Sequence, residues 1–321
     1  MLAYAVRRVL ATVPLLVLGT FIVYVLVAVS GDPLAKLATC NTCDQSAFDR
    51  IIDLYDLDKP IPERYANWIV NAVQGDFGPA VSYGSLDAGA LVLERAANSA
   101  RIAIPAFLII MAIAVALGVY SAVNQYSRLD YAVTGLSFLG ISLPTFVFAL
   151  LLQTIMIWML DGFGWRPFYV TGMRTIELDG FLDMIRSHVL PVITLVLVLT
   201  ASESRFQRAA MLEVINSDYI RTARAKGVPH RRVILRHGLR NALIPMVTIW
   251  ALDFAALLGG SVVTETIFAW PGLGPLFISA VTQLDLNLTM AIVMLTSLLV
   301  ITFNLIADLA YGWLDPRIRY E

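Results

Sequence analysis

The chain has 321 residues, of which 58% are hydrophobic and 15% are charged, and its formal net charge at pH 7 is -1. Soluble domains usually carry about 25% charged residues, so this composition excludes an ordinary soluble enzyme and a disordered chain. The balanced charge argues against nucleic-acid binding, and three histidines with two cysteines argue against a His-rich metal site. The apolar excess indicates a membrane protein.

The first apolar stretch, residues 9–29, is long enough to cross a bilayer, which takes about 20 residues. Arg7 and Arg8 before it and Ala28-Val29-Ser30 at its end also fit a cleavable signal peptide. Signal peptides usually have an apolar run of about 7–15 residues. The greater length of this run favours an uncleaved anchor.

Residues 31–101 form the longest segment between apolar stretches. Apolar residues recur at helical spacing over 48–55 and again over 65–69, with Pro60 and Pro62 between them, and 75–78 reads as a turn. About 70 residues suffice for a small helical cap but not for an independent catalytic domain. The sequence predicts two amphipathic helices here.

Cys40 and Cys43 lie in this segment, which faces outward in the topology derived below. A local disulfide is favoured on the outer side of a membrane, and two free thiols are the alternative. A metal or redox site is disfavoured because no second Cys or His pair accompanies the two cysteines.

Further apolar stretches occupy residues 102–123, 132–160, 241–264 and 286–307. A sixth, 189–202, has only 14 residues before Glu203 and Arg205, so its length alone leaves it undecided. Basic residues near span ends stay on the cytoplasmic side. The arginines before the first span, the basic segment 205–240 and the arginines near the end of the sequence share one side only if 189–202 also crosses. The sequence therefore predicts six spans and cytoplasmic termini.

Segment 205–240 carries nine basic and two acidic residues. Ser217 suits a helix N-cap, Gly227 a helix end, and Pro229 the first turn of a second helix that runs toward Arg240. The pattern predicts a stiff elbow of two short helices. Such an elbow either fixes topology and attracts anionic lipid or docks a cytoplasmic partner.

Asp253 lies in the middle of its span and Glu203 at the end of another. Ionisable residues at such depth are functional by default, so both are candidates for a substrate pathway. A purely structural, hydrogen-bonded carboxyl is the alternative for Asp253. No P-loop, G-x-S-x-G or H-E-x-x-H motif occurs, so no catalytic or metal-binding residue is assigned, and ATP-driven transport would need a motor on another chain.

Several short motifs follow one another in a fixed order. They are SGDP at 30–33, LDKP at 57–60, GDFG at 75–78, LGISLP at 139–144, DYIRTARAKG at 218–227, LRNALIP at 239–245, ETIF at 265–268, WPGLG at 270–274 and LDPRIRY at 314–320. In this order they resemble the permease subunits of bacterial oligopeptide and dipeptide ATP-binding-cassette (ABC) importers. Of the loop pattern of the wider importer class, Glu-Ala-Ala-x-x-x-Gly, only Ala223 and Gly227 remain.

The resemblance implies an all-α polytopic membrane protein of the plasma (inner) membrane, with the type I ABC importer permease fold. Residues 1–30 would be a cytoplasmic stub and first helix, 31–101 an external helical segment, and 102–321 the permease core. It also implies that 217–237 form coupling helices that insert into an ATPase groove. The coupling residues would be Arg221, Thr222, Ala223, Arg224, Ala225, Lys226, Gly227, Arg231 and Arg232.

The implied partners are a homologous second permease, two ABC ATPase domains that use ATP and Mg²⁺, an external peptide-binding protein and membrane lipid. The chain is expected to bind no cofactor and no nucleic acid. A gradient-driven secondary transporter is the alternative, disfavoured because no internal repeat is visible. An importer of the same class that carries nickel, glutathione or haem is a further alternative.

Overall fold

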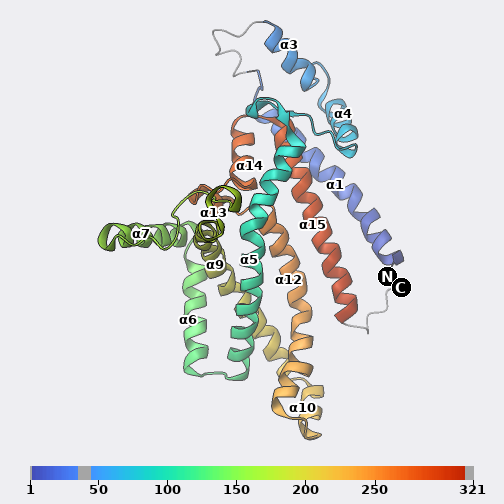
Figure 1. The fold of residues 1–321 in the computed structure, drawn as a ribbon. Coiled ribbons are helices and arrows are strands. Elements are labelled where there is room, and N and C mark those ends of the chain that lie inside the picture. Colours follow the sequence, from blue (N-terminus) through green and yellow to red (C-terminus); the bar gives the residue numbers. More distant parts are fainter. Residues whose placement is uncertain (1, 35–44, 315–321) are drawn as a thin grey trace.

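The long apolar stretches fold into helices, since within hydrocarbon every backbone amide needs a partner in its own segment. The structure, a computed structural model, describes residues 2–34 and 45–314 as a helical bundle with a small cap at one end (Figure 1). Six stretches are long and apolar enough to cross a membrane. They contain α1 (Leu2–Ser30), α5 (Ala88–Val123), α7 (Thr145–Phe163), α9 (Phe181–Ile215), α12 (Arg240–Leu258) and α15 (Leu286–Leu314). The all-α, six-span prediction is confirmed.

Helix α9 resolves the short stretch 189–202. With 35 residues it is long enough to span, because it continues past Glu203 and Arg205 for three more turns. Glu203 is buried, whereas Arg205 is exposed and stacks over the Phe138 ring at 4.3 Å. The two charges thus lie on different faces of α9, as their spacing predicts.

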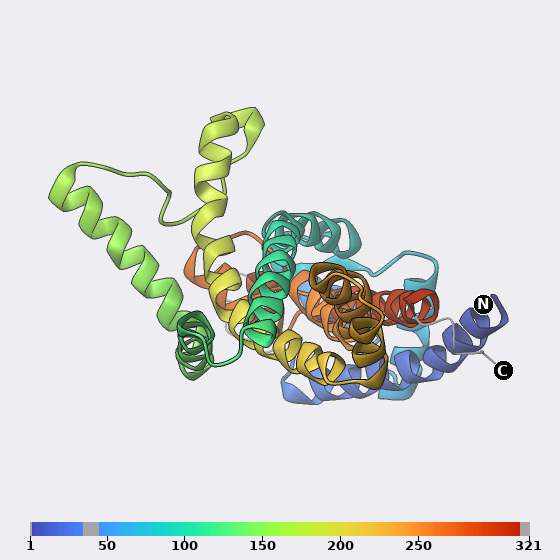
Figure 2. The same cartoon turned by 90° about the horizontal axis from the view of Figure 1, so that it is seen from below.

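The apolar stretch 132–160, counted as a single span in the sequence, is divided between two helices. Helix α6 (Arg128–Ser142) ends before Leu143, which is extended at φ -97° and ψ 131°, and α7 starts after Pro144. A residue before proline avoids the helical region, and proline lacks the N–H that would continue the ladder. Helix α7 therefore turns away from α6 and projects from the bundle (Figures 1 and 2).

The stretch 241–264 also differs from its prediction. Helix α12 ends at Leu258, where two glycines follow, and the short α13 (Val262–Ile267) begins after a turn. Toward the N-terminus the helix does not stop at Arg240. Helix α11 (His230–Arg232) and the π-helical segment η2 (Val233–Leu239) run without a break into α12. The second helix of the predicted elbow is therefore the first part of the fifth span.

The cap contains the two amphipathic helices that the sequence predicts, α3 (Gln45–Leu54) and α4 (Ile61–Val73). The antiparallel pair β1 (Pro79–Ala80) and β2 (Leu86–Asp87) follows, with the 3-10 turn η1 (Val81–Tyr83) between the strands. Helix α5 starts at Ala88, so residues 88–101 extend the second span rather than the cap. Cys40 and Cys43 lie outside the described residues.

Three shorter helices complete the described chain: α8 (Ile176–Asp179), α10 (Asp218–Ala225) and α14 (Leu273–Thr282). Helix α14 packs beneath the cap, where Leu273, Leu276 and Ala280 are buried against the outer part of α5 and the start of α15. Helix α10 lies at the far end of the bundle from the cap (Figure 1). The predicted external segment and the predicted coupling segment are thus at opposite ends.

Candidate functional site

The basic elbow, residues 217–239, consists of α10, the turn at Gly227, α11 and η2. Ser217 is the extended N-cap residue of α10, as predicted, but its hydroxyl donates to Val214 O at 2.6 Å and does not cap the helix. Asp218 instead forms an ion pair with Arg221 in the first turn of α10. A carboxylate at this position also stabilises the helix dipole.

Gly227 ends α10 as the sequence predicts. Its φ is +74°, and the N–H groups of Gly227 and Val228 donate to Arg224 O at 3.0 Å and Ala223 O at 3.2 Å. These bonds satisfy carbonyls that the helix end leaves free. No heavy atom lies within 4 Å of the place that a Cβ would take. The glycine is therefore required by the backbone conformation and not by lack of space.

One side of the elbow is fixed to the bundle by apolar contacts. Ile220 of α10 is fully buried, and Ile234 of η2 packs with Met211 of α9 and Ala242 of α12. The Asn241 amide donates to the Tyr219 hydroxyl at 3.1 Å, which ties α10 to α12. A displacement of the elbow must therefore move α12 and the end of α9.

The other side of the elbow carries exposed positive charges. Arg221, Arg224, Lys226, Arg231 and Arg232 are all exposed. Within the part of the chain that the structure describes, Arg221 pairs with Asp218, whereas the other four make no ion pair. Thr222, Ala223 and Ala225 lie between these cations on α10. The surface is free to attract an acidic partner.

An ion pair that the sequence analysis missed braces the same end of the bundle. Arg208 of α9 donates two hydrogen bonds to the carboxylate of Asp130, from Nε at 2.9 Å and from NH2 at 3.0 Å. Asp130 lies two residues before the apolar stretch 132–160, and its side chain is 5% exposed. The Arg208 guanidinium holds the pKa of Asp130 below its ordinary value. The Ser127 hydroxyl, at the N-cap of α6, accepts from the Asp130 N–H at 3.2 Å, and the Asp130 carboxylate accepts from the Tyr126 N–H at 2.9 Å. The pair Ser127 and Asp130, three residues apart before an apolar run, is the local signal of this helix start.

The two carboxyl residues predicted separately, Glu203 on α9 and Asp253 on α12, lie together. The two side chains approach each other across α9 and α12 closely enough to interact, and the Trp250 indole lies beside Glu203. Glu203 is 2% exposed, and its Oε2 has no hydrogen-bond partner among the described residues. Two carboxylates in contact repel each other, so such a pair is stable with a proton or a cationic group between them.

Asp253 also lines a cavity of about 270 Å³ between α9, α12 and α13. Most of its lining is apolar, including Leu195, Leu199 and Leu257. The other polar lining residues are Thr145, Ser261 and Thr264. The hydroxyls of Ser261 and Thr264 find no hydrogen-bond partner in the described chain, although Thr264 is only 1% exposed. An apolar cavity with a few convergent polar groups is typical of a binding site.

At the outer end, a network that we call the outer lock (residues 98–99 and 265–274) joins α5 to the segment after α12. Glu265 is fully buried and accepts from the Ser99 hydroxyl and the Gly274 N–H, both at 2.8 Å. The Trp270 indole donates to Asn98 O at 2.8 Å. A Cβ on Gly272 would lie 2.4 Å from Glu265 Oε2. The motifs ETIF and WPGLG thus have a structural explanation.

Comparison with known proteins adds two family matches. Residues 114–320 match the "Binding-protein-dependent transport system inner membrane component", and residues 1–92 match the N-terminal part of such membrane components. The chain is 38% identical over 322 residues to the "Oligopeptide transport system permease protein AppB" of Bacillus subtilis, with 100% of both chains covered. It is 36% identical to the OppB permease of Mycobacterium tuberculosis, with 99% of both chains covered. Identity to the "Glutathione transport system permease protein GsiC" of Pectobacterium atrosepticum is 35%, with 100% of both covered.

Proposed function

The chain belongs to the family of binding-protein-dependent transport system inner membrane components, and from this membership we propose that it forms half of the pathway of an ATP-driven peptide importer. It is a multi-pass permease subunit of the ABC class, and relatives that match its full length are named for oligopeptide transport. The gradient-driven alternative has no support among these relatives. Glutathione, itself a peptide, remains within the proposed substrate class because GsiC is also a full-length relative.

The observation that carries the proposal is the unbroken helix from the elbow to Asp253. Residues 230–258 run continuously through α11, η2 and α12, which at 1.5 Å per residue is about 40 Å of helix. Its first turns belong to the basic elbow and its last turns to the cavity beside α9 and α13. A push on the elbow therefore reaches the candidate pathway through a single stiff element.

In this mechanism the chain itself catalyses no reaction. ATP and Mg²⁺ are used by two ATPase domains, which receive the exposed cations of the basic elbow in an acidic groove. Closure of these domains on ATP shifts the elbow, and the bundle moves between inward-facing and outward-facing states, as expected of a two-state element biased by a ligand. Gly227 and the turn that it forms transmit the shift from α10 to the helix at 230–258.

The orientation follows from charge. We place both termini and the basic elbow in the cytoplasm, because basic residues resist translocation, and the cap outside, where an external peptide-binding protein delivers substrate. A homologous second permease completes the pathway. Helix α7, with Phe146, Leu150 and Trp158 exposed, offers that second permease or lipid an apolar surface.

Within the bundle we assign Asp253 and Glu203 to the substrate pathway. The carboxyl pair offers a counter-charge for the ammonium group of a peptide, and the adjoining apolar cavity accommodates an apolar side chain. The unpartnered hydroxyls of Ser261 and Thr264 supply hydrogen bonds to the peptide group between them. These assignments rest on the geometry of the cavity and on the peptide class named for the relatives.

The test is Gly227→Val in the complete complex, reconstituted in liposomes with tri-alanine as substrate. A β-branched residue at positive φ costs about 1–2 kcal/mol and distorts the turn without a steric clash. We expect uptake to fall at least tenfold, while ATP hydrolysis continues and the complex stays assembled. Gly164→Val is the matched control, because Gly164 also ends a helix at positive φ (+63°) with open space around it. Normal uptake by Gly227→Val would refute the assignment of Gly227.

A further inference from the structure

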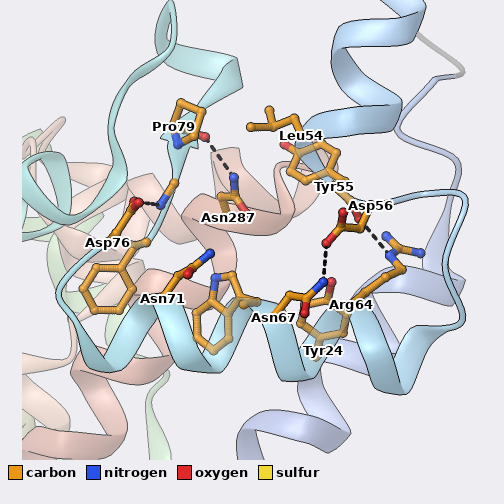
Figure 3. A pocket seen from close by; sticks show the side chains of 13 residues that line it. Tyr24, Leu54, Tyr55, Asp56, Arg64, Asn67, Asn71, Asp76, Pro79 and Asn287 are labelled. Carbon is orange, nitrogen blue, oxygen red and sulfur yellow. Dashed lines mark hydrogen bonds between the residues drawn. The ribbon is translucent and has the colours of Figure 1, made fainter.

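A second cavity, the outer groove, lies in the cap and takes no part in the mechanism above. It has a volume of about 220 Å³ and is bounded by α1, α4, the turn at 76–79 and the start of α15 (Figure 3). Its lining includes the polar residues Asp56, Arg64, Asn67, Asn71, Asp76 and Asn287 and the aromatic residues Tyr24, Tyr55, Trp68 and Phe77. The groove is far from Asp253, at the end of the molecule that we place outside.

The outer groove has hydrogen-bonding groups without partners. The Trp68 indole N–H has none in the described chain, although Trp68 is only 7% exposed. The Asn71 carboxamide is exposed to solvent and makes no hydrogen bond to a described residue, whereas the buried Asn287 reaches Pro79 O only at 3.4 Å. A buried donor without a partner costs about 1–3 kcal/mol. Trp68 and Asn287 are thus poorly satisfied inside the groove wall, and the exposed Asn71 can exchange water for a ligand at little cost.

The three carboxamides face the groove from two walls. Asn67 and Asn71 are one turn apart on the same face of α4, and Asn287 approaches from α15 on the opposite wall (Figure 3). The Asn67 amide donates to Asp56 at 2.7 Å, which leaves its carbonyl oxygen as an acceptor. A carboxamide has the donor and acceptor set of a peptide group. One helical turn separates Asn67 from Asn71, about 6 Å along the axis. This is close to the two-residue repeat of an extended chain, about 6.8 Å, so the two carboxamides suit alternate peptide groups of such a chain.

Other ligand classes fit less well. A free anion would meet the carboxylates of Asp56 and Asp76, and a free cation would meet Arg64, which is itself buried. A sugar needs an exposed ring face, but the Trp68 ring packs against Tyr24, Tyr65 and Phe77, with centroids 6.2–6.4 Å apart. The Trp68 ring therefore offers no open face to a ligand, and its Nε1 is enclosed as well. A neutral ligand rich in peptide groups satisfies all of these constraints.

We propose that the outer groove binds the main chain of an extended peptide, and that this peptide is the transported substrate on its way in. The identity of the peptide as substrate rests on the proposed function. The cavity has room for roughly seven waters at about 30 Å³ each, which is comparable to the main chain of a dipeptide and too small for a folded loop. A site that recognises the main chain of a peptide can bind peptides with different side chains. A carrier of varied peptides needs a site of this kind.

The test measures equilibrium binding of radiolabelled tri-alanine to the assembled complex in nanodiscs, without the external binding protein. We expect Asn71→Leu to weaken binding about fivefold to tenfold, as for the loss of one or two hydrogen bonds. The exposed Gln74 is the C-cap residue of α4 and does not line the groove, so Gln74→Leu is the control. Tri-alanine methylated on its main-chain nitrogens should bind no better to wild type than to Asn71→Leu.

Equal binding of tri-alanine by wild type and Asn71→Leu, or none by wild type, would overturn the proposal. A third result is that Asn71→Leu lowers the affinity of the external binding protein, with or without peptide; the occupant is then a segment of that protein, and the substrate assignment is wrong. ATP-driven uptake of tri-alanine by the wild-type complex is measured alongside. Its absence would contradict the proposed function, whereas normal uptake with an unaltered Asn71→Leu variant would contradict only this inference.

Discussion

The outer lock and the basic elbow contain charged residues in opposite settings. Glu265 is buried, and each of its oxygens accepts a hydrogen bond, one of them from Ser99 on a helix 166 residues earlier in the chain. In the elbow, Arg224 and Arg231 are exposed, and within the described chain they make no ion pair. The outer charge is part of the packing between helices, whereas the inner charges lie on a surface.

This difference distinguishes charged residues that stabilise the fold from charged residues that are available to bind a partner. A buried carboxylate that loses its donors destabilises a protein strongly, because groups that were paired are left without partners. Exposed charges contribute little to stability, typically about 0–1 kcal/mol even when paired. The cations of the elbow are thus available to a partner at little cost to the fold, and substitutions at the two ends should separate stability from coupling.

The largest effect on stability is expected from Glu265→Ala in the outer lock. The change leaves the Ser99 hydroxyl and the Gly274 N–H without an acceptor and opens a cavity beside Gly272. We expect the free energy of unfolding to fall by about 3 kcal/mol or more. The measurement is the Tm of the purified chain in detergent, which should be lower than that of wild type. Glu265→Gln keeps one acceptor oxygen for either the Ser99 hydroxyl or the Gly274 N–H, so it should lower the free energy of unfolding by less. A Tm of Glu265→Ala equal to that of wild type would show that the lock does not hold the helices together.

A smaller effect is expected from Asp130→Asn, which removes the charge from the pair with Arg208. We expect the free energy of unfolding to fall by about 1–2 kcal/mol, less than for a fully buried pair, because Arg208 is partly exposed and remains in contact with water. The pKa of Asp130 is lowered in the folded protein, so the stabilisation is complete above its ordinary value of 3.8 and is lost as the pH falls through the folded value. The Tm difference between wild type and Asp130→Asn should therefore shrink below about pH 4.

Asp218 provides the control for this prediction. It also forms an ion pair with an arginine, but both side chains are exposed, at 72% for Arg221 and 90% for Asp218. Asp218→Asn should lower the free energy of unfolding by less than about 0.5 kcal/mol, so that its Tm changes much less with pH than that of Asp130→Asn. The exposed pair is screened by water and salt, and the carboxylate contributes mainly through the helix dipole. A pH-independent difference for Asp130→Asn would contradict the role of its charge.

The elements that the sequence predicts well are those fixed by local rules. Six spans, two cap helices and the helix end at Gly227 follow from apolar length, helical period and the backbone freedom of glycine. The sequence does not predict that one helix ends before Pro144 and another begins after it, because a proline inside a long apolar run is compatible with either a kinked helix or a helix end. Packing decides between them, and α7 leaves the direction of α6 entirely (Figure 2).

The contacts between distant residues were not predictable. Glu203 and Asp253 were named separately, yet nothing in a single sequence says that positions 50 residues apart meet across two helices. The same holds for Asp130 with Arg208, 78 residues apart. Arg208 looked like one more charge of a basic segment, although its guanidinium belongs to the fold and those of Arg224 and Arg231 to the surface.

The smallest effect on stability is expected from Arg224→Ala, which makes the comparison between the two ends sharpest. The side chain is exposed, so the free energy of unfolding should change by less than about 0.5 kcal/mol. The Tm should therefore stay close to that of wild type. Binding of the ATPase subunits, measured by titration in nanodiscs, should weaken several-fold at low salt and less at high salt, because the attraction is screened. Arg50→Ala removes an equally exposed charge from α3 in the cap and should change neither quantity. If Arg224→Ala lowers the Tm as much as Asp130→Asn, the charge of Arg224 stabilises the fold. If the variant binds the ATPase subunits like wild type, the charge does not serve that partner.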